Sequence, residues 1–171
     1  MINNDVLRRI RYIFDYDDDK MIDLFAQADC KVTREHVCDW LKQETDPDFQ
    51  ACDDRQMATF LNGLINARRG RREGPQPVPE DTLNNNMIFM KLRIALDMKS
   101  EDVLALLEKA GFSLSKHELT AFFRKPGHKH YKECKDQVLR NFLKGLQLQH
   151  RGNVELQVQQ VPQAHNIWKQ S

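Results

Sequence analysis

The chain has 171 residues, of which 40% are hydrophobic and 30% charged, and its formal net charge is +1. This length allows one domain or two small ones, and the near-neutral charge selects no class of partner. No apolar run approaches the roughly 18 residues needed to cross a bilayer, and the N-terminal stretch lacks the pattern of a secretion signal. We therefore expect no association with a membrane.

The first part of the chain predicts four helices. Residues 4–14 place apolar side chains at helical spacing and follow an asparagine suited to a helix cap. Residues 20–28 and 33–43 predict a second and a third helix, and 53–64 a fourth with Asp54 near its N-terminus. Gly63 lies within or near the end of this fourth helix, where close helix approach or a C-terminal cap would account for it.

Residues 67–83, ARRGRREGPQPVPEDTL, are rich in Arg, Gly and Pro and predict a linker. Helical patterns then return at residues 100–110, 115–125 and 135–146. Ser115 and Glu118 form a capping box at the start of the second of these, and Pro126 ends it. The tail has weak strand-like alternation at Val154, Leu156 and Val158, and we expect it to be flexible.

The two helical regions are copies of one unit. Residues 3–64 align without a gap on residues 85–146, at an offset of 82, with about a fifth of the positions identical and apolar residues matching apolar ones. The segments FLNGL and FLKGL, at residues 60–64 and 142–146, match in this register. The sequence therefore predicts an all-α protein of two four-helix units in tandem. The predicted division is residues 1–66, a linker at 67–83, residues 84–150, and a tail at 151–171.

Several of the repeated segments carry a resemblance to a known family. The combination of NND and LRRIRYIF, FLNGLINARRG, a Pro-rich linker, NNN and KLRIA, and HKHYKECKDQVLRNFLKGL resembles the YehS-like family of small bacterial proteins. The resemblance covers about residues 1–150. It implies the duplicated architecture, but the function of that family is uncharacterised, so the resemblance transfers no active site.

The two units have opposite charge. Residues 3–64 hold 8 Lys and Arg against 14 Asp and Glu, a net charge of −6, whereas residues 85–146 hold 12 against 7, a net charge of +5. The second and third helices of each unit have helix-turn-helix spacing. In the second unit, the outward positions of the third helix and the following loop are basic, which suits a phosphate backbone. The nucleic-acid-binding candidates are Lys116, His117, Thr120, Arg124, Lys129 and Lys132.

The same charge asymmetry has a second interpretation. The acidic unit would bind a protein partner, or the basic unit of a neighbouring chain. We take a non-catalytic protein-interaction or adaptor module as the leading hypothesis and a nucleic-acid-binding regulator as the alternative. A nucleic-acid-binding surface would expose the basic groups on one face, whereas charge pairing between the units would bury them against the first unit.

The remaining candidates concern metals and thiols. His128, His130 and Cys134 form an H-x-H-x3-C pattern suited to zinc, although no fourth ligand is evident, and an exposed loop is the simpler interpretation. Cys52 and Cys134 recur before the fourth helix, where a thiol is either activated or buried as a small apolar side chain, and we favour burial. The pattern of cysteines, which includes no CxxC, indicates reduced thiols in a cytoplasmic protein.

Other recurring polar residues have structural interpretations. We expect one asparagine of each recurring pair, Asn3 with Asn4 and Asn85 with Asn86, to cap the first helix of its unit. Arg11 and Arg93 would pair with Asp15 and Asp97, four residues on. No acyl-transfer triad, glycine-rich phosphate loop or calcium loop is visible, so we expect neither an enzyme nor a bound cofactor.

Overall fold

The computed structural model describes the backbone of residues 1–159 and the side chains of residues 1–152. Within that part of the chain the regular structure is entirely helical. The first unit contains α1 (Asn3–Ile13), α2 (Asp18–Ala26), α3 (Arg34–Leu41) and α4 (Asp54–Arg69). The second contains α5 (Asn85–Ala95), α6 (Ser100–Lys109), α7 (Lys116–Phe122) and α8 (Asp136–Gln159). The predicted all-α tandem repeat is confirmed, and each helix of the second unit begins 82 residues after its counterpart.

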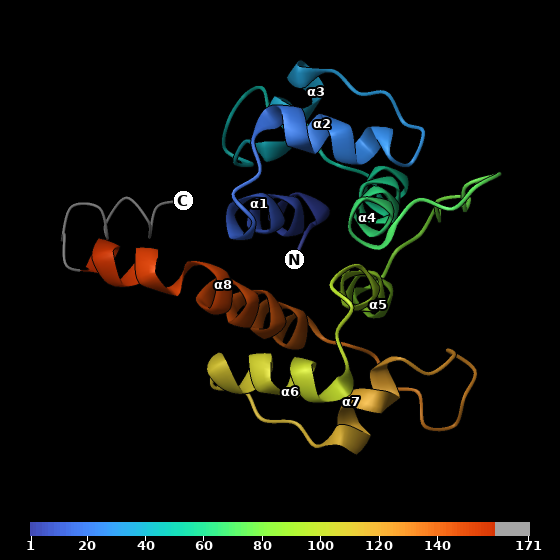
Figure 1. Ribbon diagram of the computed structural model, residues 1–171, viewed down its shortest axis with the longest axis vertical. Coiled ribbons are helices and arrows are strands. Elements are labelled where there is room, and N and C mark those ends of the chain that lie inside the picture. The colour runs from blue at the N-terminus through green and yellow to red at the C-terminus, as the bar shows by residue number, and fades with distance from the viewer. Residues whose placement is uncertain (160–171) are drawn as a thin grey trace.

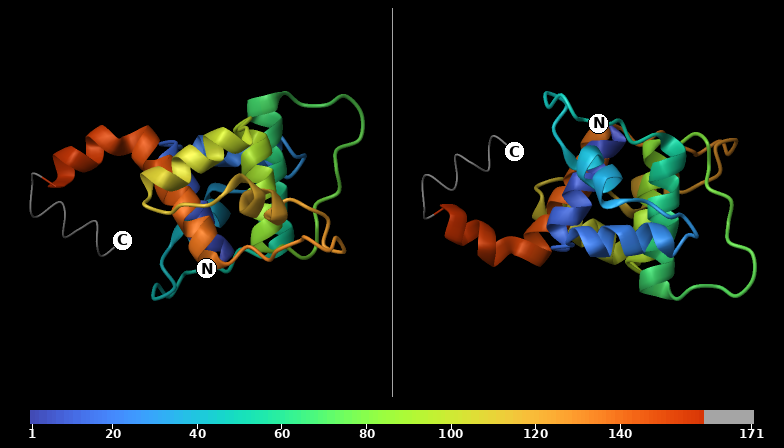
Figure 2. Two further views of the ribbon diagram at one scale, coloured as in Figure 1. Left: turned by 90° about the horizontal axis from the view of Figure 1, so that it is seen from below. Right: turned by 90° about the horizontal axis from the view of Figure 1, so that it is seen from above.

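The two units pack through their first and last helices. In Figure 1, α1 and α4 lie next to α8 and α5 in the middle of the molecule, with α2 and α3 outside them on one side and α6 and α7 on the other. The contacts of α4 with α5 and of α1 with α8 exchange under the 82-residue offset, so an approximate two-fold axis relates the units. Figure 2, in which the molecule is seen from below and from above, shows the second unit overlying the first in one view and the first overlying the second in the other. Buried side chains of both units form one continuous core.

The recurring glycines lie where two helices cross. A Cβ at Gly63 would lie 1.7 Å from the backbone oxygen of Leu24 in α2, and a Cβ at Gly145 would lie 2.2 Å from that of Leu106 in α6. Leu24 and Leu106 are themselves counterparts in the repeat. Glycine therefore recurs in FLNGL and FLKGL because α4 and α8 contact a neighbouring backbone directly at this position.

The recurring asparagines tie the α3–α4 and α7–α8 loops to the first helix of their unit. Asn4 is buried, and its Nδ2 donates to the carbonyls of Trp40 and Gln50, both at 2.8 Å, while its Oδ1 accepts from the Cys52 amide at 3.0 Å. Asn86 repeats this arrangement on the second loop. The expectation that one asparagine of each pair caps the first helix was wrong, because the N-cap residues are Ile2 in α1 and Asn84 in α5.

The expected pairs between Arg11 and Asp15 and between Arg93 and Asp97 do not form either. Both aspartates have positive φ, of 53° and 52°, which turns them away from their own helix. Asp97 instead pairs with Arg69 of α4 at 2.9 Å, and Asp15 pairs with Arg151 of α8 at 3.5 Å. Because Arg69 and Arg151 are 82 residues apart, these are reciprocal ion pairs between the units.

The linker and tail differ from expectation at their edges. Helix α4 continues to Arg69, so the first residues of the predicted linker are helical. Helix α8 continues to Gln159 after a kink at Arg151, so Val154, Leu156 and Val158, in the tail that was expected to be flexible, lie in a helix. The rest of the predicted tail lies outside the described residues. The linker is held against the helices, for example by Arg55 with Asp81 at 2.9 Å.

Candidate functional site: a cleft beside α5

The residues predicted to bind nucleic acid are exposed, apart from the half-buried Thr120. Two of them, however, already contact other groups of the second unit. Lys116 pairs with Glu101 of α6 at 3.0 Å. Its counterpart Arg34 pairs with Asp19 of α2 in the same way, so this contact belongs to the repeated scaffold. The Thr120 hydroxyl donates to the Lys116 carbonyl at 2.8 Å, within its own helix. These two side chains are therefore engaged in contacts inside the unit.

Carboxylates interrupt the basic surface of α7 and the loop that follows it. Glu133 pairs with Lys135 at 3.1 Å, next to Lys132 in sequence. The amide of Ser115 donates to Glu118 and, with the nearby charges of Lys132 and His117, lowers the pKa of that carboxyl. The α6–α7 connection spans residues 110–115, which is longer than the three or four residues of a DNA-binding helix-turn-helix. The exposed face is thus mixed in charge.

The side chains of His117, His128 and His130 lie near one another, but Cys134 is buried in the core. The ring centroids of His128 and His130 lie 5.5 Å apart, and His117 lies 6.1 Å from His130. Cys134 is 2% exposed, and burial raises the pKa of its thiol to about 12. Across the described residues, no group of three or more His, Cys, Asp and Glu side chains is able to hold a metal ion. Cys134 is buried in the core while His128 and His130 are exposed, so the arrangement gives no support to these weak zinc candidates.

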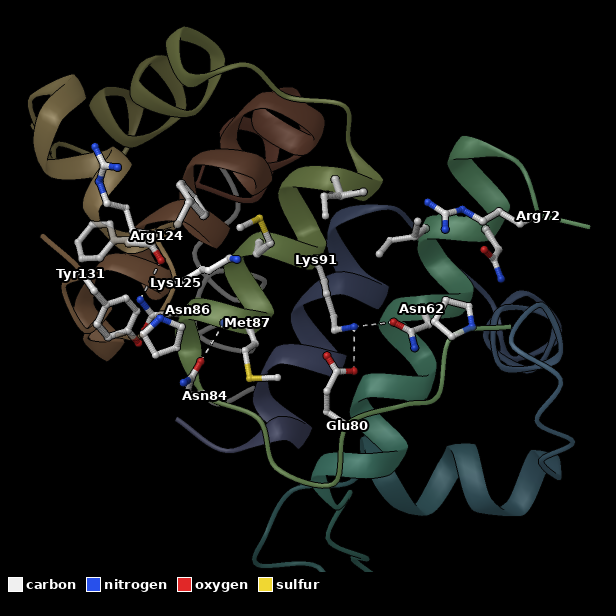
Figure 3. A pocket seen from close by; sticks show the side chains of 18 residues that line it. Asn62, Arg72, Glu80, Asn84, Asn86, Met87, Lys91, Arg124, Lys125 and Tyr131 are labelled. Atoms are coloured by element: carbon white, nitrogen blue, oxygen red, sulfur yellow. Dashed lines mark hydrogen bonds and ion pairs between the residues drawn. The ribbon is translucent and has the colours of Figure 1, made fainter. Parts of the chain in front are cut away.

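A cleft of about 520 Å³ lies along α5 in the second unit. Its walls come from α4, α5, the linker and the α7–α8 loop (Figure 3). Apolar side chains form most of its surface: Ile65, Pro77, Met87, Met90, Ile94, Phe122, Phe123, Pro126 and Tyr131. Ile94 is the most exposed large apolar side chain in this lining, at 45%.

The charged groups around the cleft fall into two kinds. Lys91, at its centre, donates to Asn62 at 2.6 Å and pairs with Glu80 of the linker at 3.1 Å. Arg72, Arg124 and Lys125 also border the cleft, and among the described side chains no carboxylate forms an ion pair with any of them. Figure 3 places Arg124 and Lys125 on one side of the cleft and Arg72 on the other. The cleft is therefore neutral in the middle and positive at both ends.

The equivalent positions of the first unit have the opposite character. Met87 and Met90 of α5 correspond to Asp5 and Arg8 of α1. Arg8 pairs with Asp5 and donates to the carbonyl of Lys42 at 2.7 Å, so this surface of the first unit carries an ion pair where the second has methionines. The tandem fold does not itself require an apolar cleft, because the first unit folds with charged residues at the same positions.

Of the residues predicted to bind a ligand, only Arg124 lines the cleft. Comparing the first helices of the two units position by position would have revealed Met87, Met90 and Ile94 as apolar residues aligned with Asp5, Arg8 and Tyr12. The other walls come from distant segments, which helical periodicity does not bring together. The lining contains no Ser, Thr, Cys or His side chain, and its single carboxylate is paired with Lys91. Its other polar side chains are amides, cationic groups and the phenol of Tyr131.

The buried thiols of Cys52 and Cys134 are unsuited to nucleophilic chemistry. Cys52 is 4% exposed, and burial, together with Asp53 and Asp54, raises the pKa of its thiol to about 12. Cys134 occupies the same place in the second unit. This agrees with burial and not with activation at a helix N-terminus. Among the described residues, no helix has the length and apolar character required to span a membrane.

Comparisons with known proteins agree with the duplicated architecture. A family model described as "Protein of unknown function (DUF1456)" matches twice, at residues 3–70 and 85–152. The chain is 42% identical over 147 residues to "Uncharacterized protein YehS" of Escherichia coli (strain K12), covering 85% of this chain and 94% of that protein. No solved structure matches. The two matches extend the repeat beyond Leu64 and Leu146 to Gly70 and Gly152, and so include the reciprocal arginines Arg69 and Arg151. The chain therefore belongs to the DUF1456 family of YehS-like proteins, which carries no assigned function.

Proposed function

We propose that the protein is a non-catalytic interaction module that docks a segment of a partner protein in the cleft beside α5. The observation that carries this proposal is the difference between the units. The two units share their buried contacts. Where the first unit has the Asp5–Arg8 ion pair, however, the second has Met87 and Met90. Methionine is flexible and polarisable, and it suits surfaces that adapt to a bound apolar group.

The character of the cleft supports binding to a protein. An apolar patch with a polar border is typical of a docking site, and Arg and Met are enriched at protein interfaces. Ile94 remains 45% exposed on α5, where the first unit has Tyr12. Covering Ile94 and its neighbours with a partner would remove this apolar surface from water.

A photo-crosslinking experiment tests the proposal. A photoreactive phenylalanine analogue replaces Ile94 in the full chain, which is expressed in its native host and irradiated. The matched control places the same analogue at Val78, an apolar side chain that is 78% exposed but does not line the cleft. We expect a protein-sized adduct from position 94, none from position 78, and loss of the adduct when Met90→Asp is added. Equal labelling from both positions, or none from position 94, would contradict the proposal.

Nucleic-acid binding is the second candidate. The observation in its favour is that Lys116, Arg124, Lys129 and Lys132 are exposed and are not buried against the first unit. The carboxylates of Glu101 and Glu133 within the same surface weigh against it. Fluorescence anisotropy with labelled duplex DNA and single-stranded RNA across a salt series distinguishes the two. Contact with phosphates predicts a slope of about −0.9 in log affinity against log salt for each phosphate on duplex DNA. Absence of binding at low salt would eliminate this candidate.

A further inference from the structure

We infer that the occupant of the cleft is an acidic amphipathic segment, in which apolar side chains are flanked by Asp or Glu. This inference rests on the proposed function and specifies the chemistry of the partner. It follows from the charges at the ends of the cleft and from the spacing of the apolar side chains along α5.

The charges select an acidic partner. Arg72 lies at one side of the cleft and Arg124 and Lys125 at the other, and no described side chain neutralises them. Lys91 lies between them but is already paired with Glu80, so the middle of the cleft offers no free positive charge. A ligand with apolar groups at its centre and carboxylates at both ends matches this distribution. A basic segment would place like charges against each other at both ends.

The apolar residues define the length of the contact. Met87, Met90 and Ile94 are separated by three and four residues and so form a stripe along α5. The stripe covers about 10 Å at a rise of 1.5 Å per residue. That length accommodates apolar side chains one helical turn apart, the spacing with which an amphipathic helix enters an apolar groove.

A second copy of the chain fits less well. Its acidic unit would have to enter the cleft of the first copy, which leaves the cleft of the second copy open for a third. Contacts between two different surfaces of one molecule form open chains unless the rotation closes a ring. A segment of a different protein satisfies the cleft in a single binding event, and we therefore commit to that occupant.

Selection from a random dodecapeptide library displayed on phage tests the inference on the full chain. We expect enriched peptides to carry two apolar residues three or four positions apart with Asp or Glu on both sides. The most enriched peptide, labelled with fluorescein, should bind about tenfold or more weakly to the double variant Arg124→Glu, Lys125→Glu. The matched control, Lys99→Glu with Lys109→Glu, makes the same change in charge at exposed positions outside the cleft and should leave the affinity unchanged.

The other outcomes separate this inference from the proposed function. If the peptides lack acidic residues, or if binding is lost in Ile94→Asp but not in the Arg124, Lys125 variant, the cleft docks a protein of different chemistry and the inference is overturned. If no peptide is enriched while position 94 still crosslinks to a protein, the inference fails and the proposed function stands. If neither experiment gives a signal, both fail. Concentration-dependent assembly of the chain alone, lost in Ile94→Asp, would identify a second copy as the occupant and overturn the inference. Thermal melts of each variant confirm that it is folded.

Discussion

Replacing the recurring glycines by alanine should destabilise the protein, although alanine is the better helix former. A contact between a Cβ and a backbone oxygen needs about 3.4 Å, so about 1.7 Å is missing at Gly63 and about 1.2 Å at Gly145. The obstacle at each site is backbone, so the helices must move apart. Overpacking of this kind costs about 3 kcal/mol or more, and alanine returns about 1 kcal/mol of helix propensity. We expect a net loss of about 2–3 kcal/mol for Gly63→Ala and a smaller loss for Gly145→Ala.

Urea unfolding and thermal melts, both followed by circular dichroism, measure these losses. At about 2–4 °C for each kcal/mol, Gly63→Ala should lower Tm by about 4–12 °C. Gly152→Ala is the matched control, since a Cβ there meets nothing within 4 Å, and it should be neutral or slightly stabilising. A Gly63→Ala protein as stable as the unmodified chain would refute the argument that a close backbone approach explains the repeated glycine.

Three further predictions concern the contacts that the repeats share. Asn4→Asp should cost about 2–4 kcal/mol in urea unfolding, because an oxygen would face two carbonyls; unchanged stability would show that these hydrogen bonds contribute little. A double-mutant cycle between Arg69 and Asp97, with alanine at each, should give a coupling energy of about 0–1 kcal/mol that falls with salt, since both groups are exposed; a larger, salt-independent value would contradict this. Burial raises the pKa of the Cys52 and Cys134 thiols to about 12 in the folded protein. Their contribution to stability should therefore be complete below the pKa of an unfolded thiol, about 8.5, and should decline as pH rises toward 12. Thermal melts between these limits should show less decline for Cys52→Ala with Cys134→Ala, and equal decline would place the cause elsewhere.

A comparison of the two units shows which packing contacts are repeated within the chain and which surface residues differ. The glycine crossings and the asparagine hydrogen bonds occur in both units with nearly the same geometry. The first helices differ where they face outward, with Asp5 and Arg8 in one unit and Met87 and Met90 in the other. Features present in both units are therefore explained by the shared fold. The cleft beside α5 is the principal difference between the units, and we interpret it as functional.

The sequence by itself determined the helices and their duplication. Helical periodicity is a local property, and the 82-residue register is readable by direct alignment, so the starts of the helices in the two units were predictable as a set. The recurrence of Gly63 and Gly145 was visible in the same way, with close helix approach among the expected reasons. The end of α4 at Arg69 was missed because Ala67, Arg68 and Arg69 were assigned to the linker by composition.

Only the tertiary structure decided which distant residues meet. Asn4 reaches Gln50 and Asp97 reaches the other unit's Arg69, and neither partner lies within one helical turn of the residue that binds it. The cleft arises in the same way, because α4, α5, the linker and the α7–α8 loop are brought together only when the two units pack. Periodicity reports which face of a helix is apolar, but the partner of that face depends on the packing of the whole chain. This is why the architecture was predictable from the sequence and the candidate binding site was not.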